Sequence, residues 1–229
     1  MHQVRIPEHI VRRVMERRGS LHIYDRLEPS TTALVVVDMQ NAYVLAGMPL
    51  EVPCASEIVP NVNRLAAAVR HGGGVVIWLQ MTPGTKDDWP ACYNRFGPAF
   101  GDAVAAHLAR GAPGHALVDS LDVRPEDLRV EKTRYSAFIQ GASSLDGELR
   151  RRGVDTIVVV GTLTNVCCEA TVRDAMMLNY RAVLVSDANA ALSDDEHNMA
   201  LANTLSTFGD VLSSDEVIAA LADRERSGP

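Results

Sequence analysis

The sequence predicts an α/β fold in which helices cover both faces of a six-stranded, mostly parallel sheet. Short apolar runs rich in β-branched residues, such as TALVVV at 32–37 and DTIVVV at 155–160, are typical of buried strands. Stretches with helical apolar spacing lie between these runs, and strands that alternate with helices favour parallel pairing. The 229 residues contain no internal repeat or long linker, so the chain fits one sizeable core.

Each strand is predicted from a short apolar run that follows a turn or a helix. The run at 155–160 is the most apolar, and 75–79 follows three glycines that end a helix. The predicted strands are 32–37, 75–79, 128–131, 155–160, 182–185 and 211–212.

The helices are predicted from apolar spacing and from their end signals. In 59–71 the residues Val62, Leu65, Ala66 and Val69 share one face, and SDDE at the start of 193–208 is a capping box. The predicted helices are 8–18, 59–71, 100–110, 144–152, 165–178, 193–208 and 214–223.

Two segments fall outside the alternating pattern. Residues 1–30, which include the arginine-rich helix, are expected to form an arm on the main domain (31–229) or on a neighbouring subunit. Residues 82–113 are polar and proline-rich, with one helix expected, and lie where a lid over a site would lie.

Composition and charge exclude several classes of function. A formal charge of −7 and a pI of about 5.5 disfavour nucleic acid as a partner. No apolar stretch is long enough to span a bilayer, and the first residues lack the apolar core of a secretory signal. Four cysteines in a chain of this length do not form a disulfide framework, so we expect a cytoplasmic protein with reduced thiols.

Lysine is rare in this chain. Of 22 basic residues only Lys86 and Lys132 are lysines, and Lys132 ends an apolar strand where a charge needs a partner. Lysine there indicates a need for a compact ammonium rather than a planar guanidinium, although chance explains one such residue equally well.

Three chemically distinct side chains follow three of the predicted strands. Asp38 ends the first strand, Lys132 ends the third, and Cys167 falls in the first turn of the helix after the fourth. Each has an ordinary alternative, as a turn residue, a surface lysine and a buried small side chain. Open α/β sheets bind ligands outside the carboxyl ends of their strands, so the three together favour catalysis.

The residue types fit nucleophilic acyl transfer through a thioester. A helix N-terminus and the Lys132 ammonium are expected to favour the Cys167 thiolate. Asp38, with a pKa raised by burial, would take the thiol proton and return it to the leaving group. Main-chain N–H groups at the start of the helix would hold the oxyanion.

Three segments resemble the signature regions of the isochorismatase-like cysteine hydrolases. They are VVVDMQNAY (35–43), EKTRYSAF (131–138) and VVGTLTNVCCEATVRDA (159–175), and the resemblance spans residues 31–217. It implies a three-layer α/β/α fold of Rossmann-like type, an Asp38–Lys132–Cys167 triad and a cis peptide between Thr162 and Leu163. It also implies an oxyanion hole from the N–H groups of Leu163 and Cys167, and a homo-oligomer, dimer or tetramer. Cys168, one position further along the helix, is expected to pack against the sheet.

Within this family, a cysteine nucleophile implies an amidase-type reaction. Metal-dependent members bind their ion through an Asp-x-His motif, but no histidine lies between His22 and His71 or between His71 and His107. We therefore expect no metal and no cofactor. The segments resemble most the branch that cleaves small linear ureido and carbamoyl compounds, including ureidoacrylate, biuret and N-carbamoyl amino acids. A cyclic or aromatic amide substrate, and a non-catalytic ligand-binding role, remain alternatives.

Several residues near the strand ends are candidate substrate contacts. Trp78 and Gln80 share one side of their strand by alternation. We expect Trp78 to form a wall of the pocket and Gln80 to hydrogen-bond a urea group. The other candidates are Asn41, Tyr43 and Tyr135, with Arg134 or Arg95 for a substrate carboxylate and Cys92 within the lid. His197, on a polar helix face, is expected to be solvated or capping.

Overall fold

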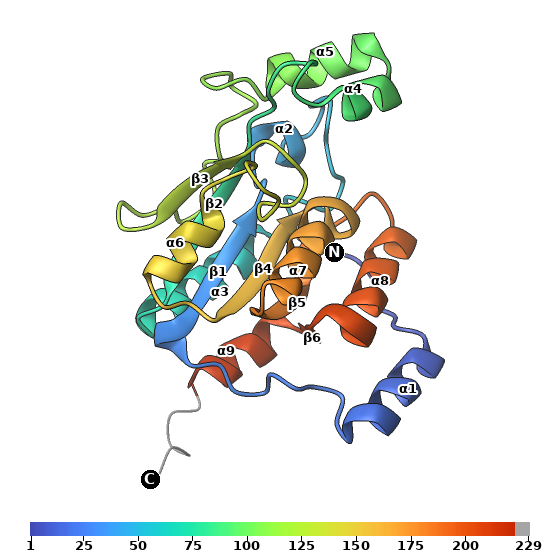
Figure 1. Cartoon of the computed structure of the whole chain (residues 1–229), viewed down its shortest axis with the longest axis vertical. Coiled ribbons are helices and arrows are strands. Elements are labelled where there is room, and N and C mark those ends of the chain that lie inside the picture. The colour runs from blue at the N-terminus through green and yellow to red at the C-terminus, as the bar shows by residue number, and fades with distance from the viewer. Residues whose placement is uncertain (223–229) are drawn as a thin grey trace.

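Six parallel strands form a single sheet in the computed structural model, which describes residues 1–222 (Figure 1). The order across the sheet is β3-β2-β1-β4-β5-β6. The strands are β1 (Thr32–Val37), β2 (Val75–Met81), β3 (Leu128–Lys132), β4 (Thr156–Thr162), β5 (Arg181–Ala190) and β6 (Asp210–Leu212). The chain order reverses between β1 and β4, so their carboxyl ends flank the switch point where open α/β sheets bind ligands.

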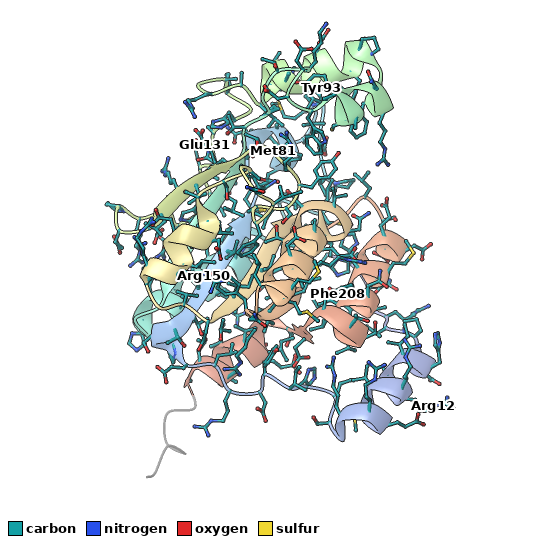
Figure 2. The ribbon with its side chains drawn as sticks, in the orientation of Figure 1. Arg12, Met81, Tyr93, Glu131, Arg150 and Phe208 are labelled. Atoms are coloured by element: carbon teal, nitrogen blue, oxygen red, sulfur yellow. The ribbon has the colours of Figure 1, made fainter. Side chains whose placement is uncertain are left out.

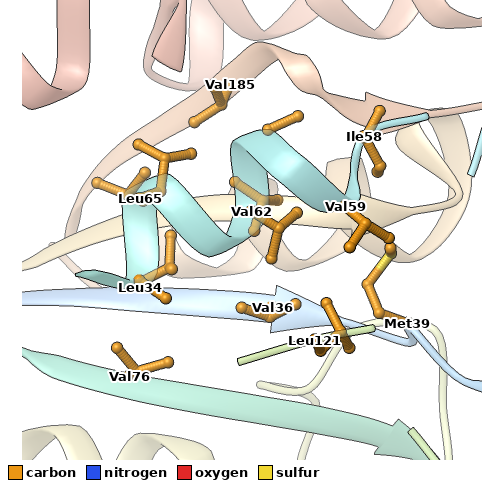
Figure 3. Packing of buried hydrophobic residues seen from close by; sticks show 14 of the residues in the cluster. Leu34, Val36, Met39, Ile58, Val59, Val62, Leu65, Val76, Leu121 and Val185 are labelled. Atoms are coloured by element: carbon orange, nitrogen blue, oxygen red, sulfur yellow. The ribbon is translucent and has the colours of Figure 1, made fainter. Parts of the chain in front are cut away.

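Helices cover both faces of the sheet, as the alternating pattern predicts. One apolar cluster joins even-numbered β1 residues such as Leu34 and Val36 to α3 (Val59–His71) and α9 (Ser214–Ala222), as Figure 3 shows in part. The other joins Ala33, Val35 and Val37 to α6 (Leu145–Arg151), α7 (Glu169–Met177) and α8 (Asp194–Asn203). Both side-chain sets of β1 are buried, which explains its unbroken apolar sequence.

Two predicted helices are each divided by a change of helix type. The helix expected at 165–178 begins as a wider π-helical turn, η2 (Thr164–Cys168), before α7. The helix expected at 193–208 is α8 followed by a second such turn, η3 (Thr204–Phe208). Apolar periodicity cannot distinguish these turns from an α-helix over so few residues. The end of the helix predicted at 214–223 lies outside the described residues.

The lid segment holds more helix than the sequence predicts. It contains α4 (Pro90–Phe96) and α5 (Pro98–His107), each with a proline in its first turn, instead of one helix at 100–110. Figure 1 shows this pair beyond the carboxyl ends of the strands, next to the short helix α2 (Asn41–Val44). The strand predicted at 182–185 is also longer, because β5 continues to Ala190 past an irregularity in its pairing with β4.

The N-terminal arm packs on its own domain. In α1 (Glu8–Arg18), Val14 is buried in the same cluster as α7, and a guanidinium N–H of Arg18 donates to the Leu205 carbonyl at 2.9 Å. No helix within residues 1–222 is long and apolar enough to cross a membrane.

Candidate active site

Asp38 is fixed by both strands that flank β1. Its main-chain N–H donates to the Leu79 carbonyl of β2 at 3.0 Å, and its carbonyl accepts a 3.0 Å hydrogen bond from Thr162 Oγ1 of β4. Its φ is +52°, a left-handed conformation that aspartate tolerates better than most residues. This turn of the backbone ends β1 and leaves the carboxylate buried, with 1% of the residue exposed.

Gly161 allows β1 and β4 to lie close together beside Asp38. A Cβ on Gly161 would lie 2.1 Å from the Val37 carbonyl oxygen, and its φ of +115° is accessible only to glycine without strain. The glycine therefore permits the approach that brings the Thr162 hydroxyl to Asp38.

Lys132 forms a buried ion pair with Asp38. Its Nζ lies 2.7 Å from Asp38 Oδ2, and the residue is fully buried. The ammonium also donates to the Arg134 carbonyl at 3.2 Å and lies 3.7 Å from the Sδ of Met81, which Figure 2 labels at the carboxyl end of β2. Burial lowers the pKa of Lys132, but its interactions with Asp38 first and with Cys167 second offset this and leave the pKa raised. The structure thus places a compact ammonium among three close partners.

The Cys167 thiol completes this group. Cys167 lies in η2, is 6% exposed and lies close enough to Asp38 and Lys132 for both side chains to shift the pKa of its thiol. Burial raises the pKa of Asp38, while the Lys132 charge and hydrogen bonds from Lys132, Cys167 and the Met81 main chain oppose it. The three side chains predicted from three strand ends therefore meet in one buried cluster.

The expected thiolate is not the resting form of Cys167. Burial first, and the adjacent Asp38 carboxylate after it, raise the pKa of this thiol to about 12 against the opposing charge of Lys132. One ammonium cannot stabilise two buried anions as well as it stabilises one. The thiol is therefore neutral near pH 7, and Asp38 carries the negative charge of the pair.

Cys168 faces away from this chemistry. It is fully buried in the apolar cluster against the sheet, and burial raises the pKa of its thiol well above the ordinary value. Its side chain packs as predicted.

The loop before Cys167 has the backbone feature that the resemblance implies. The peptide bond between Thr162 and Leu163 is cis. The Leu163 carbonyl accepts from the main-chain N–H groups of Val166 and Cys168, both at 3.1 Å, and so holds the loop against η2. The oxyanion hole built from the N–H groups of Leu163 and Cys167 stays a prediction.

Aromatic side chains lie near the end of β2. Tyr43 packs in an apolar cluster with Met81 and Trp89, and burial, followed by the charge of Asp38, raises the pKa of its hydroxyl well above the ordinary value. The Tyr135 hydroxyl lies 3.5 Å from Cys92 Sγ of α4, and its ring meets Trp89 edge-on with centroids 4.8 Å apart. Trp89 and Cys92 of the lid therefore contact Tyr135, one of the predicted substrate contacts.

Trp78 and Gln80 do not join the cluster. Their side chains share a side of β2, as predicted, but it is the face of the sheet covered by α3, opposite Cys167. The Trp78 indole N–H donates to Asp127 at 2.8 Å, and Gln80 donates to the His115 carbonyl at 2.9 Å. Trp78, predicted as a pocket wall, is thus a core residue. Alternation predicts that Trp78 and Gln80 share one side of β2, but it does not predict which face of the sheet that side forms.

Gln80 borders a separate groove of about 1020 Å³ beside β3, and neither Asp38 nor Cys167 lines this groove.

The other predicted contacts lie on or beside the lid. Asn41 donates its side-chain N–H to the Pro113 carbonyl at 2.9 Å, which attaches the lid's far end to α2. Arg134 donates to the Asp88 carbonyl at 2.6 Å and lies over the Trp89 ring, so its guanidinium holds the lid. Arg95, on α4, is exposed and forms no ion pair within residues 1–222. Burial raises the pKa of Tyr135, and the nearby charge of Arg95 opposes this shift.

Two buried residues have contacts that sequence reasoning missed. Gln40 accepts from the Met81 N–H at 2.8 Å and donates to the Met81 carbonyl at 3.1 Å, joining the ends of β1 and β2 beyond their ladder. His197 is fully buried rather than solvated, with ring nitrogens 2.9 Å from Thr164 Oγ1 and 3.0 Å from the Ser186 carbonyl. The sequence gives no signal of which hydrogen-bond partner a buried polar side chain will have.

Residues 1–222 contain no group of three or more His, Cys, Asp or Glu side chains arranged to hold a metal ion.

The family model of the Isochorismatase domain matches residues 32–216. The chain belongs to the isochorismatase family. Ureidoacrylate amidohydrolase RutB from Pseudomonas savastanoi pv. phaseolicola is 36% identical over 213 residues, which cover 83% of this chain and 84% of the relative.

Solved isochorismatase-family structures have the same fold. A cysteine hydrolase from Pseudomonas syringae pv. phaseolicola has a TM-score of 0.78 and 33% identity, over 85% of this chain and 94% of that one. N-carbamoylsarcosine amidase from Thermoplasma acidophilum has a TM-score of 0.66 and 29% identity, over 81% and 97%. This isochorismatase-family protein is a hydrolase that acts on C–N amide bonds of a small molecule.

Proposed function

We propose that the protein is a cysteine-dependent amidohydrolase that cleaves small linear ureido or carbamoyl compounds through a thioester. The buried contact of Cys167 with Asp38 and Lys132 supports this most directly. It joins a nucleophile to a base, and the base to a fixed cation, in a volume that excludes water.

The proton on Cys167 moves only as the carbon–sulfur bond forms. Sγ attacks the carbonyl carbon while Asp38 accepts the thiol proton, which the raised pKa of Asp38 favours. The carbonyl oxygen becomes an oxyanion, held by the N–H groups of Leu163 and Cys167. The C–N bond then breaks, and Asp38 returns the proton to the departing ammonia or amine.

The thioester is hydrolysed by the same groups in reverse roles. Asp38 takes a proton from water as the water oxygen attacks the thioester carbon, and the C–S bond breaks. Asp38 returns that proton to the Cys167 sulfur, and Lys132 stays protonated throughout because its pKa is raised. The free enzyme is thereby restored with no cofactor consumed.

The proposed substrate is a linear ureido acid whose carboxylate binds Arg95. Arg95 on the lid is a cation available for a substrate carboxylate, whereas Arg134 is held by main-chain carbonyls. Two similar proteins are named ureidoacrylate amidohydrolase and N-carbamoylsarcosine amidase, and each name contains a substrate with a ureido or carbamoyl group. The rings of Tyr43, Trp89 and Tyr135 favour a second candidate, a planar cyclic or aromatic amide, because such rings stack on aromatic side chains.

A panel of amides tests the proposal. Linear ureido acids, N-carbamoyl amino acids, biuret and aromatic amides are supplied separately, and released ammonia is measured. We expect turnover of a linear ureido or carbamoyl compound, and an acyl adduct on Cys167 by mass spectrometry. Cys167→Ala should abolish turnover while the matched variant Cys168→Ala retains it. Full activity of Cys167→Ala would disprove the mechanism, and exclusive turnover of aromatic amides would favour the second substrate class.

A further inference from the structure

The N-terminal segment reaches the loop that precedes Cys167. His2 lies against α8, where its Nδ1 is 2.7 Å from Asp194 Oδ1 and its Nε2 accepts from the Ala191 main-chain N–H at 3.0 Å. Figure 1 shows the N-terminus away from α1, and His2 and Gln3 both contact Asp194 at the start of α8. The His2 side chain is 4% exposed, so this contact is a packed one.

His2 stacks on the buried His197. The two imidazole centroids are 4.5 Å apart and their planes differ by 21°. His197 in turn lies 2.9 Å from the hydroxyl of Thr164, the residue that follows Leu163 and begins η2. A continuous series of contacts thus runs from residue 2 to the turn that carries Cys167.

The hydrogen-bond partners define the tautomer of each ring. A carbonyl oxygen can only accept, so His197 Nε2 carries a proton toward Ser186, and Nδ1 of the neutral ring accepts from the Thr164 hydroxyl. A main-chain N–H can only donate, so His2 Nε2 is unprotonated and its Nδ1–H donates to Asp194. Protonation of His197 would place a second donor against Thr164 and reverse that bond.

We propose that His197 is a positioning residue of the candidate active site, which holds the 163–164 segment through the Thr164 hydroxyl and is itself held by His2. This rests on the proposed function, in which the Leu163 N–H binds the oxyanion. The Thr164 hydroxyl is buried and bonds to His197, so losing that bond lets the adjacent Leu163 N–H move relative to Cys167. Such a loss weakens binding of the transition state more than binding of the substrate.

The charges around His197 keep its ring neutral. Burial is the main reason that its pKa is lowered to about 4; a protonated His2 would act in the same direction, and the carboxylate of Asp194 acts in the opposite one. The Ser186 carbonyl, from β5, favours the protonated form. Removing His2 would expose the ring and raise its pKa.

Threonine variants test the proposal. Thr164→Val removes the donor at nearly constant volume, and we expect kcat to fall about tenfold with KM changed less than about twofold, a smaller loss than deletion of an oxyanion donor. Thr164→Ser should recover most of kcat. The matched control is Thr204→Val, because Thr204 is also fully buried but its hydroxyl has no hydrogen-bond partner in the described chain. Wild-type kcat in Thr164→Val, or a serine variant no better than valine, would overturn the proposal.

A second measurement does not depend on turnover. Proton–nitrogen correlation spectra of the imidazoles should show His197 protonated at Nε2 and unprotonated at Nδ1 near pH 7. Its titration midpoint should rise in His2→Ala but not in His9→Ala, since His9 is exposed on α1. Equal midpoints in the two variants would contradict the role of His2, even if Thr164→Val fails to fold. If Cys167→Ala retains turnover, the proposed function fails instead, and the spectra still decide the His2–His197 contact.

Discussion

Lys132 and Asp38 form their ion pair across an intervening strand. Lys132 ends β3 and Asp38 follows β1, and β2 lies between them, yet Nζ and Oδ2 are 2.7 Å apart. The lysine side chain spans this gap beside Met81, the residue of β2 that pairs with Lys132 of β3. The pair therefore depends on strand order as much as on residue type.

Lys132→Arg should lose most activity although it conserves charge. The ammonium is fully buried with three close partners, and a planar guanidinium fits neither the volume nor those directions. We expect kcat/KM to fall by at least about 100-fold, the scale of a lost acid–base contribution. Lys86→Arg, at an exposed position, is the matched control and should match wild type. Wild-type kinetics in Lys132→Arg would remove the requirement for lysine.

Lys132→Met should destabilise the fold more than the double variant with Asp38→Asn. The single change leaves a buried carboxylate without its cation, which costs about 3–5 kcal/mol in the free energy of unfolding, whereas removing both charges is close to neutral. The folded-state pKa of Asp38 is already raised and would rise further, so the folded protein binds the extra proton. The deficit should therefore grow as pH rises and shrink as pH falls. Denaturant unfolding at several pH values measures this, and equal stabilities of single and double variants would contradict it.

Alkylation of Cys167 by iodoacetamide should be slow near pH 7. Burial raises the pKa of the thiol to about 12, so the thiolate fraction, and with it the labelling rate, should increase with pH across the neutral and alkaline range. Asp38→Asn removes a negative charge that raises this pKa, and should therefore label faster than wild type while losing turnover. Mass spectrometry of the Cys167 peptide gives both rates. Faster labelling of wild type than of Asp38→Asn would show that the resting form is a thiolate.

Gly161→Ala should prevent stable folding of the site. The new Cβ would lie 2.1 Å from the Val37 carbonyl oxygen, and β1 and β4 would have to separate where Thr162 holds Asp38. Gly153→Ala is the control: its φ of +67° costs about 1–2 kcal/mol, but no atom lies within 4 Å of the new Cβ. Thermal unfolding compares the two variants, and similar melting temperatures would contradict the close approach.

Arg95→Met should discriminate among substrates by charge. If Arg95 binds a carboxylate, kcat/KM for an anionic ureido acid should fall about tenfold or more, while a neutral ureide should be unaffected. The variant Arg129→Met on the exposed face of β3 serves as a control. An equal fall for neutral and anionic substrates would assign Arg95 to lid structure.

The sequence carries most of the strand and helix pattern because burial on two faces requires unbroken apolar runs. The runs at 32–37 and 155–160 predict β1 and β4 nearly to the residue. The lid is less predictable, because α4 and α5 bury little apolar surface and leave no strong periodicity. The same applies to η2, since a π-turn differs from an α-turn only in its hydrogen-bond register.

The amino-acid sequence is enough to show that an acid, an ammonium and a thiol follow parallel strands, and therefore lie at one edge of a sheet. The face that each side chain occupies depends on tertiary packing, because a strand that is apolar on both faces gives no signal of which face is which. Tertiary packing turned Trp78 and Gln80 away from Cys167 and brought Tyr43, Cys92 and His197 toward the site. It also decided the proton's resting position, since the desolvation that keeps Cys167 neutral depends on everything packed around it.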